Sequence, residues 1–400
     1  MQQIETTDIV VSGGGVAGLT AAAAFGAAGF QVVCVDPAAP VTEESDENAD
    51  LRTTAFLQPA RTLLEDCGLW ERLSAHAAPL RIMRIVDAGG ATPEARLSRD
   101  FDSSEISDQP FGWNLPNWLL RREMVARLAE LPNVSFRPGV ALTSLFTRSA
   151  EARVTLSEGR PISARLVVGA DGRNSTVRQA CGIGVRTTRY GQKALAFAVS
   201  HPIPHENVST EVHRTGGPFT LVPLPDRNGV PCSAVVWMQT GPEVQRLAAL
   251  PVPEFEAEMT ARSANVLGPL SLITRRTVWP IISQIAERFC AERVALLAEA
   301  AHVVPPIGAQ GLNMSLADLR CLLELARQTT DALGDAAMLS AYHHRRWPEV
   351  RARVAGIDLL NRASMVGQPI LRDLRAATLN TLYGLRPIRK TLMKAGLGVS

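Results

Sequence analysis

The sequence predicts an α/β fold in which a Rossmann-like domain is interleaved with an antiparallel β-sheet lobe, followed by C-terminal helices. Residues 8–36 read as a buried strand, a glycine turn, an Ala-rich helix and a second buried strand, which is how a doubly wound domain begins. From 194 to 238, strand-like runs alternate with Pro and Gly turns, as in an antiparallel sheet. Strand and helix return from 293 onward, so we expect the first domain to be discontinuous in sequence.

The order of these patterns gives provisional domain bounds. We assign residues 1–75, 113–190 and 276–342 to the first domain, 76–112 and 191–275 to the sheet lobe, and 343–400 to a helical C-terminal region. Within the first domain, 53–73 is predicted to be helical because leucines recur at roughly helical spacing. A second helix is expected over 121–131, ended by Pro132.

Composition excludes several classes of protein. Hydrophobic residues make up 46% and charged residues 20% of the 400, which are ordinary globular values and argue against a disordered or fibrous chain. The net charge of +2 argues against a nucleic-acid partner for the chain as a whole. The charge is uneven, because 343–400 holds 11 Lys or Arg against three Asp or Glu. This basic tail on an acidic body points to a partner surface.

The cysteine spacing and the N-terminal stretch indicate in which cellular compartment the protein works. No two of the six cysteines lie closer than 31 residues, so no zinc-type pair is present, and we expect reduced thiols and no metal site. Residues 9–35 carry no charge, but three glycines at 13–15 favour a buried strand–helix–strand over a membrane span. Glu5 and Asp8 stand where a signal peptide would be basic. We expect a cytoplasmic protein.

Three glycines after the first strand have the spacing Gly13-x-Gly15-x-x-Gly18, and Asp36 ends the second strand. Gly13 permits a tight turn, Gly15 lets a pyrophosphate approach the backbone, and Gly18 lets helix and strand pack closely. The pyrophosphate would lie on N–H groups of the first helical turn, which includes Val16 and Ala17, while Asp36 would accept hydrogen bonds from a ribose. In this context the pattern predicts dinucleotide binding, and it fits NAD and FAD alike.

A second motif follows the strand that ends at Gly169. It reads Asp171-Gly172, then Ser175 as a helix N-cap and Arg178. Taken alone, it is explained equally well by a turn before a capped helix. It resembles the Asp-Gly motif of flavin-dependent aromatic hydroxylases, in which the motif serves both FAD and the pyridine nucleotide.

The third segment, 293–313, resembles the flavin-binding segment of para-hydroxybenzoate hydroxylase and its relatives. The resemblance implies that a strand delivers Glu299 to the ribityl chain and that Pro305-Pro306 passes the flavin ring, with the Pro306 carbonyl near the substrate. The following turn opens a helix whose N–H groups can hold charge on the flavin's pyrimidine end. The residues expected there are Gly308, Ala309, Gln310, Gly311, Leu312 and Asn313. No side chain is assigned as an acid or base.

Further stretches narrow the resemblance to the ubiquinone-biosynthesis hydroxylases: 52–57, 63–70, 217–226 and 235–237. The family resemblance implies an FAD monooxygenase that takes NAD(P)H and O₂ as co-substrates and hydroxylates a prenylated phenol through a flavin C4a-hydroperoxide. It also implies FAD contacts from Arg52, Arg122 and Val140. His302 is interpreted as a packing or hydrogen-bonding residue near the flavin turn.

One departure keeps alternatives open. The family has Gly-Asp where this chain has Ala298-Glu299, and a carboxylate that missed its partner would cost about 1–3 kcal/mol. An FAD-dependent lipid reductase or epoxidase, and a non-catalytic lipid-binding paralogue in a quinone-synthesis complex, therefore remain possible, as does a homo-oligomer. The basic tail either contacts the inner face of the plasma membrane or packs on the acidic body or in an oligomer interface. A membrane contact would use Arg386, Arg389, Lys390 and Lys394 and an apolar helix face. That face comprises Ile370, Leu371, Leu374, Thr378 and Leu382.

Overall fold

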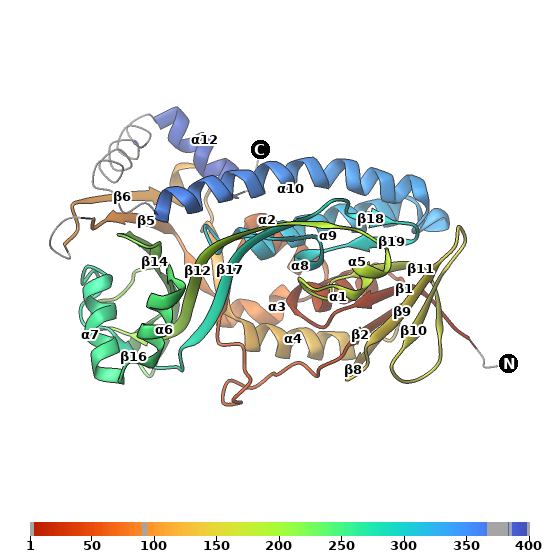
Figure 1. The fold of residues 1–400 in the computed structure, drawn as a ribbon, viewed down its shortest axis with the longest axis horizontal. Coiled ribbons are helices and arrows are strands. Elements are labelled where there is room, and N and C mark those ends of the chain that lie inside the picture. Colours follow the sequence, from red (N-terminus) through yellow and green to blue (C-terminus); the bar gives the residue numbers. More distant parts are fainter. Residues whose placement is uncertain (1–3, 90–93, 366–382, 384–385, 398–400) are drawn as a thin grey trace.

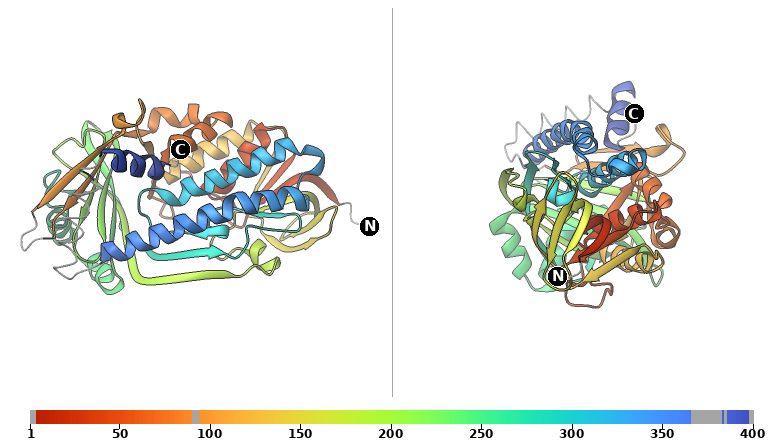
Figure 2. Two further views of the ribbon diagram at one scale, coloured as in Figure 1. Left: turned by 90° about the horizontal axis from the view of Figure 1, so that it is seen from above. Right: turned by 90° about the vertical axis from the view of Figure 1, so that its right-hand side faces the viewer.

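The computed structural model describes residues 4–89, 94–365, 383 and 386–397. Two large sheets lie along the length of the molecule, and one long helix, α10 (Ala336–Met365), runs beside both of them (Figures 1 and 2). A small three-stranded sheet completes the architecture. The predicted α/β fold with an interleaved sheet lobe is confirmed.

The first large sheet is the Rossmann-like one. Its parallel strands lie in the order β19 (Val294–Leu296), β11 (Ile162–Gly169), β1 (Glu5–Ser12), β2 (Val32–Asp36) and β8 (Val134–Pro138). Antiparallel strands extend it: β18 (Cys290–Ala291), β9 (Leu142–Thr147) and β10 (Ala152–Leu156). Helix α1 (Val16–Ala27) packs on α4 (Asn117–Ala129) and on α9 (Gln310–Gln328). The charge-free stretch 9–35 is therefore buried strand and helix, as predicted.

The second large sheet has nine strands. Its main path runs β20 (His302–Val303), β17 (Thr277–Ala286), β12 (Val185–Ser200), β15 (Val230–Thr240), β14 (Pro218–Arg227), β13 (Val208–His213), β5 (Ile82–Asp87) and β6 (Leu97–Asp102), with β16 (Ser271–Leu272) beside β12. Neighbours are antiparallel except β13 and β5, which pair in parallel. That exception arises because β5 comes from an earlier segment of the chain and joins the sheet at β13.

Alternation along β12 gives this sheet two different faces. Leu195 and Phe197 lie on the face that packs against α6 (Gly241–Ala249) and α7 (Val252–Arg262), which supply Leu247 and Phe255. The neighbouring positions 194, 196 and 198 are alanines and lie on the opposite face. Ala194 packs there with Met238, Ile281 and, from the first domain, Ile307. The small-residue face is thus the one turned toward the Rossmann-like domain.

The prediction of one helix over 53–73 was wrong at its start. Residues Thr53–Leu57 form strand β3, which pairs with β7 (Gly112–Pro116), and β7 pairs with β4 (Ala78–Leu80). Helix α2 (Gln58–Asp66) begins only afterwards, and α3 (Trp70–Leu73) follows a turn at Gly68. The leucine spacing was real, but pairing with a distant strand fixes Thr53–Leu57 in extended form. Helix α4 likewise begins at Asn117, before the predicted start.

Most of the predicted junctions between segments fall within continuous elements, although the one at 275/276 lies between β16 and β17. The bound at 190/191 lies inside β12, and β17 and β20 place part of 276–342 in the nine-stranded sheet. Helix α10 likewise begins before 343. We keep the division into three regions as a proposal in which β12 and β17 form the junction.

The remaining α-helices in the described part of the chain are short or lie near its C-terminus. They are α5 (Thr176–Ala180), α8 (Ala298–Ala301) and α12 (Arg386–Leu397). None of the described helices combines the length and apolar character that crossing a bilayer requires.

Candidate functional site

The glycine turn between β1 and α1 has the geometry that its spacing predicts. Gly13 has φ +124°, and a Cβ there would lie 2.3 Å from the Ala170 carbonyl oxygen. A Cβ on Gly18 would lie 1.9 Å from the Gly13 carbonyl oxygen, so both positions exclude a side chain. A Cβ on Gly15 would meet no described atom within 4 Å. Gly15 therefore borders open space at the start of α1.

The start of α1 is suited to an anionic group. Gly15 is the N-cap, and no described side chain caps the helix or places a negative charge in its first turn, which Val16 and Ala17 begin. The unpaired N–H groups and the helix dipole of such a terminus favour a phosphate. These residues could hold the pyrophosphate of a dinucleotide.

Asp36 lies at the end of β2, beside this turn. One carboxylate oxygen accepts a hydrogen bond from the Gly14 N–H at 2.5 Å, and the other accepts one from the Ala38 N–H at 2.8 Å. Pro138 of β8 pairs with Asp36, so Val140, two residues later, follows from the same edge of the sheet. The structure thus brings Asp36 to the glycine turn, while a contact of Val140 with the cofactor remains a proposal.

The Asp-Gly motif builds its own turn. Asp171 accepts hydrogen bonds from the Ser175 hydroxyl at 2.5 Å and from the Val177 N–H at 3.0 Å. Ser175 is the predicted N-cap, and its hydroxyl oxygen accepts from the Arg178 N–H at 2.9 Å. These bonds agree with the interpretation as a turn before a capped helix. A contact between Asp171 and the cofactor remains a proposal.

Glu299 lies just beyond the strand that was expected to deliver it. It stands in the first turn of α8, three residues after the end of β19. Ala298 before it has φ +52°, in the left-handed region that favours glycine. The Glu299 side chain is 46% exposed, and its Oε2 lies 3.4 Å from Nε of Arg173. An exposed carboxylate at this edge can accept hydrogen bonds from hydroxyl groups.

The proline turn leads into the second uncapped helix. Pro305 is buried and Pro306 exposed, and the left-handed residues Gly308 and Ala309 turn the chain into α9. Ala309 is the N-cap, and no described side chain caps this helix. The first helical turn contains Gln310, Gly311, Leu312 and Asn313. Its N–H groups could hold a second anionic group.

Asn313 fixes the start of α9 against the three-stranded sheet. Its amide nitrogen donates to the carbonyl oxygens of Ala55 at 2.7 Å and Ala309 at 2.6 Å, and its oxygen accepts from the Leu57 N–H at 2.9 Å. The Gln310 amide donates to Gly308 at 2.9 Å and to Gly396 of α12 at 3.0 Å. The turn at Gly308 and Ala309 is therefore held by the three-stranded sheet through Asn313 and by α12 through Gln310.

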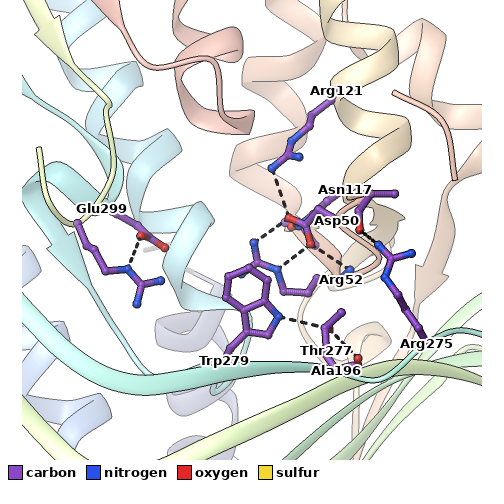
Figure 3. A network of polar contacts seen from close by, with 12 residues as sticks. Asp50, Arg52, Asn117, Arg121, Ala196, Arg275, Thr277, Trp279 and Glu299 are labelled. Atoms are coloured by element: carbon purple, nitrogen blue, oxygen red, sulfur yellow. Dashed lines mark hydrogen bonds and ion pairs between the residues drawn. The ribbon is translucent and has the colours of Figure 1, made fainter. Parts of the chain in front are cut away.

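Arg52 belongs to a polar network that joins the segment before β3 to the start of α4 and to β17 (Figure 3). Its guanidinium donates to both carboxylate oxygens of Asp50, at 2.8 and 2.7 Å, and lies 3.8 Å from the ring centroid of Trp279. Asn117 also donates to Asp50, at 3.0 Å. Burial favours a higher pKa for Asp50, but the hydrogen bonds and charge of Arg52, with Asn117 and Arg121, outweigh it and lower the pKa below its ordinary value.

The arginine that reaches this network is Arg121. Its Nη2 lies 3.5 Å from Asp50, whereas Arg122 bonds its neighbour Glu123 at 2.9 Å and lies over Trp118. An FAD contact by Arg122 remains a proposal. Sequence reasoning missed Asp50, Asn117, Arg121 and Trp279. The one available signal was the two-residue spacing between Asp50 and Arg52.

His302 is a buried hydrogen-bonding residue, as interpreted from the sequence. Its Nε2 lies 2.6 Å from Asp318, which also accepts a bond from Arg346 of α10 at 2.7 Å. This contact ties β20, which leads into the proline turn, to α9 and α10. In the described part of the chain no three His, Cys, Asp or Glu side chains are grouped to hold a metal ion.

These residues fit FAD. The open space at Gly15 and the uncapped start of α1 suit its pyrophosphate, Asp36 suits the adenosine ribose, and the half-exposed Glu299 suits the ribityl hydroxyls. The uncapped start of α9 suits the pyrimidine end of the flavin. All lie at the carboxyl edge of the Rossmann-like sheet, where ligands of such folds bind.

Gly15→Val should abolish or strongly reduce flavin binding without unfolding the protein, because the new side chain fills the space that the pyrophosphate needs. Flavin content after gel filtration and the thermal midpoint measure the two effects. Gly356→Val on exposed α10, where an added Cβ also meets nothing within 4 Å, is the matched control. Full flavin content in a folded Gly15→Val protein would contradict the assignment.

Asp50→Asn should destabilise the protein by about 1–3 kcal/mol near neutral pH, because Arg52 loses its charged partner. Since the folded pKa of Asp50 is lowered, its contribution is complete above the ordinary Asp value of about 3.9 and disappears as pH falls through the folded value. Urea unfolding at several pH values should show the gap to wild type closing in acid. The exposed Asp66→Asn is the control, and equal stability at neutral pH would refute the prediction.

Comparison with known proteins agrees with the site. A family model described as FAD binding domain matches residues 6–356. The ubiquinone hydroxylase UbiL of Rhodospirillum rubrum is 31% identical over 98% of this chain and 90% of its own. The 3-demethoxyubiquinol 3-hydroxylase of Escherichia coli is 25% identical over 99% of both chains.

A solved structure shares the fold. The p-nitrophenol 4-monooxygenase PnpA of Pseudomonas putida superposes with a TM-score of 0.79, at 19% identity over 99% of both chains. The length of the family match and the identity to the Rhodospirillum relative are sufficient to assign membership. The chain belongs to the FAD-dependent aromatic hydroxylases, in the family of the ubiquinone-biosynthesis hydroxylases, and is an O₂-dependent flavoprotein monooxygenase with NAD(P)H as its reductant.

Proposed function

We propose that the chain hydroxylates the ring of a prenylated phenol, or a closely related aromatic, in ubiquinone biosynthesis. The observation that carries this proposal is the apolar cluster beside the proline turn. Ile307 packs with Ala194, Met238 and Ile281 on the small-residue face of the nine-stranded sheet. An apolar wall next to exposed Pro306 suits a hydrophobic ring substrate. The names of the Rhodospirillum and Escherichia coli relatives support the same substrate class.

The protein's part in the reaction is binding and orientation. FAD, when bound and reduced by NAD(P)H, supplies the transfer of oxygen from O₂ to the ring. The Pro306 carbonyl is proposed to orient the substrate's hydroxyl, and the cluster around Ile307 excludes water from the ring.

Burial, reinforced by Asp358, raises the pKa of Tyr190 in that cluster to about 12, so Tyr190 stays protonated and donates to Asp358 at 2.5 Å.

Ala194→Leu should lower kcat/KM for hydroxylation of a short-chain prenylphenol by about tenfold while FAD content stays normal. The added atoms overpack a wall that is already dense beside Ile307, at a typical cost of about 1–3 kcal/mol. Product formation by mass spectrometry, together with NAD(P)H consumption, measures the effect. Ala249→Leu on the exposed end of α6 is the control. Unchanged turnover in a folded Ala194→Leu enzyme would place the substrate elsewhere.

We further propose that the C-terminal region contacts an anionic membrane surface. Arg386, Lys390 and Lys394 are exposed and spaced four residues apart, so they form one row on α12. Arg389 is not available for lipid, because it is buried and pairs with Glu105 at 2.6 Å. The apolar face expected at Ile370, Leu371, Leu374, Thr378 and Leu382 lies outside the described residues.

Lys390→Glu/Lys394→Glu should abolish flotation with anionic liposomes at low salt, because each basic residue near such a surface contributes about 1 kcal/mol. Binding by wild type should weaken at high salt. Arg148→Glu/Arg153→Glu, the same charge change on the β9–β10 hairpin, should leave flotation intact. Failure of wild type to float would instead favour an oligomer or a complex with other proteins as the partner of this row.

A further inference from the structure

We propose that Arg173 is a positioning residue for FAD, acting through Glu299, and that this pair lets the chain bind FAD with Ala298-Glu299 in place of Gly-Asp. The inference rests on the assignment of FAD to this site and is independent of the hydroxylated substrate. It deepens the site by adding a residue that the sequence motifs did not single out.

Arg173 and Glu299 each follow the end of a strand, and these two strands, β11 and β19, are neighbours in the Rossmann-like sheet. Gly169 at the end of β11 pairs with Leu296 at the end of β19, and the Leu297 N–H donates to the Gly169 carbonyl at 2.8 Å. Arg173 follows four residues after Gly169, and Glu299 three residues after Leu296. Two neighbouring loops therefore carry opposite charges to the edge where the ribityl chain is assigned.

A buried arginine fixes these loops relative to each other. Arg178, only 4% exposed, donates to the Ala300 carbonyl at 2.9 Å and to the Arg173 carbonyl at 2.8 Å. Gln284 of β17 donates to the same Arg173 carbonyl at 3.2 Å. The backbones of both loops are thus held by three hydrogen bonds. The distance between the Arg173 and Glu299 side chains follows from a braced scaffold rather than from two loose loops.

The contact with Arg173 restrains the orientation of the Glu299 side chain, which is longer than the family's Asp. Glu has one methylene more than the family's Asp, and its extra rotatable bond must be restrained for the carboxylate to serve one partner. Nε of Arg173 lies 3.4 Å from Glu299 Oε2, with the two side chains 29% and 46% exposed. Burial favours a lower pKa for Arg52, but the bonds and charge of Asp50 and, after them, the charge of Glu299 raise it above its ordinary value. Glu299 therefore lies in the field of guanidinium groups and remains a strong acceptor for hydroxyl hydrogens.

A double-mutant cycle on FAD affinity tests this role. The apoprotein is titrated with FAD, and quenching of flavin fluorescence gives the dissociation constant, with no aromatic substrate present. Arg173→Met should weaken binding by roughly two- to fivefold, which is the range for a half-exposed ion pair, and Arg173→Lys should retain most of the affinity. In a Glu299→Asp background, Arg173→Met should have a clearly smaller effect, because the shorter carboxylate no longer needs Arg173.

Arg153→Met removes a half-exposed Arg–Glu pair elsewhere and should leave the dissociation constant unchanged. Thermal midpoints of the apoproteins separate affinity from folding. Arg173→Gln, which also removes the charge, carries the test if Arg173→Met does not fold. Unchanged FAD affinity in Arg173→Met overturns the proposal. An equal loss in the wild-type and Glu299→Asp backgrounds also overturns it, since Arg173 would then act on FAD directly. Because no substrate is used, neither result depends on which ring the enzyme hydroxylates.

Discussion

The backbone of Gly18 passes so close to the Gly13 carbonyl that even a methyl group would lie 1.9 Å from its oxygen, and Gly13 in turn touches Ala170. This contact brings the start of α1 and the ends of β1 and β11 to one point. The strand β19 continues the same edge, since Leu296 pairs with Gly169. Three segments far apart in sequence can surround one extended cofactor only because these strand ends converge without intervening side chains.

The long antiparallel pair β12 and β17 imposes the second constraint. Their side chains alternate, so the large residues Leu195 and Phe197 must all lie on the face covered by α6 and α7. The same alternation sends Ala194 and its alanine neighbours toward the Rossmann-like domain, where Ile307 meets them. A single register thus buries the lobe's core and leaves a thin apolar wall beside Pro306. A shift of β12 by one residue would exchange the large side chains on one face with the alanines on the other.

Sequence reasoning succeeded where structure is set by neighbours in the chain. The glycine turn and the Ser175 cap follow from local spacing, and both appear as predicted. It failed where a distant segment decides: Thr53–Leu57 is extended because β7 pairs with it, despite its helical leucine spacing. The Asp50 network was missed for the same reason, since Arg121 and Trp279 reach it only through the fold. Alanine itself does not indicate the left-handed conformation of Ala298, and the signal for it was the glycine that the resembled family has at this position.

The acidic side chains of the site share an arrangement that suits an anionic cofactor. Asp50 is held by Arg52, and Glu299 lies beside Arg173, while Asp36 and Asp171 are occupied by backbone N–H and hydroxyl donors. An unpaired carboxylate near the pyrophosphate would repel it and would itself be costly to desolvate. The arginine partners of Asp50 and Glu299 weaken that repulsion, while Asp36 and Asp171 keep their charge and are stabilised by neutral hydrogen-bond donors. Each carboxylate keeps lone pairs for hydroxyl groups of the ribose and ribityl chain. The two helix termini proposed to hold the pyrophosphate and the flavin carry no acidic residue in their first turns, so no carboxylate there would compete with the ligand. Binding FAD therefore depends as much on where this chain pairs its carboxylates as on where its glycines make room.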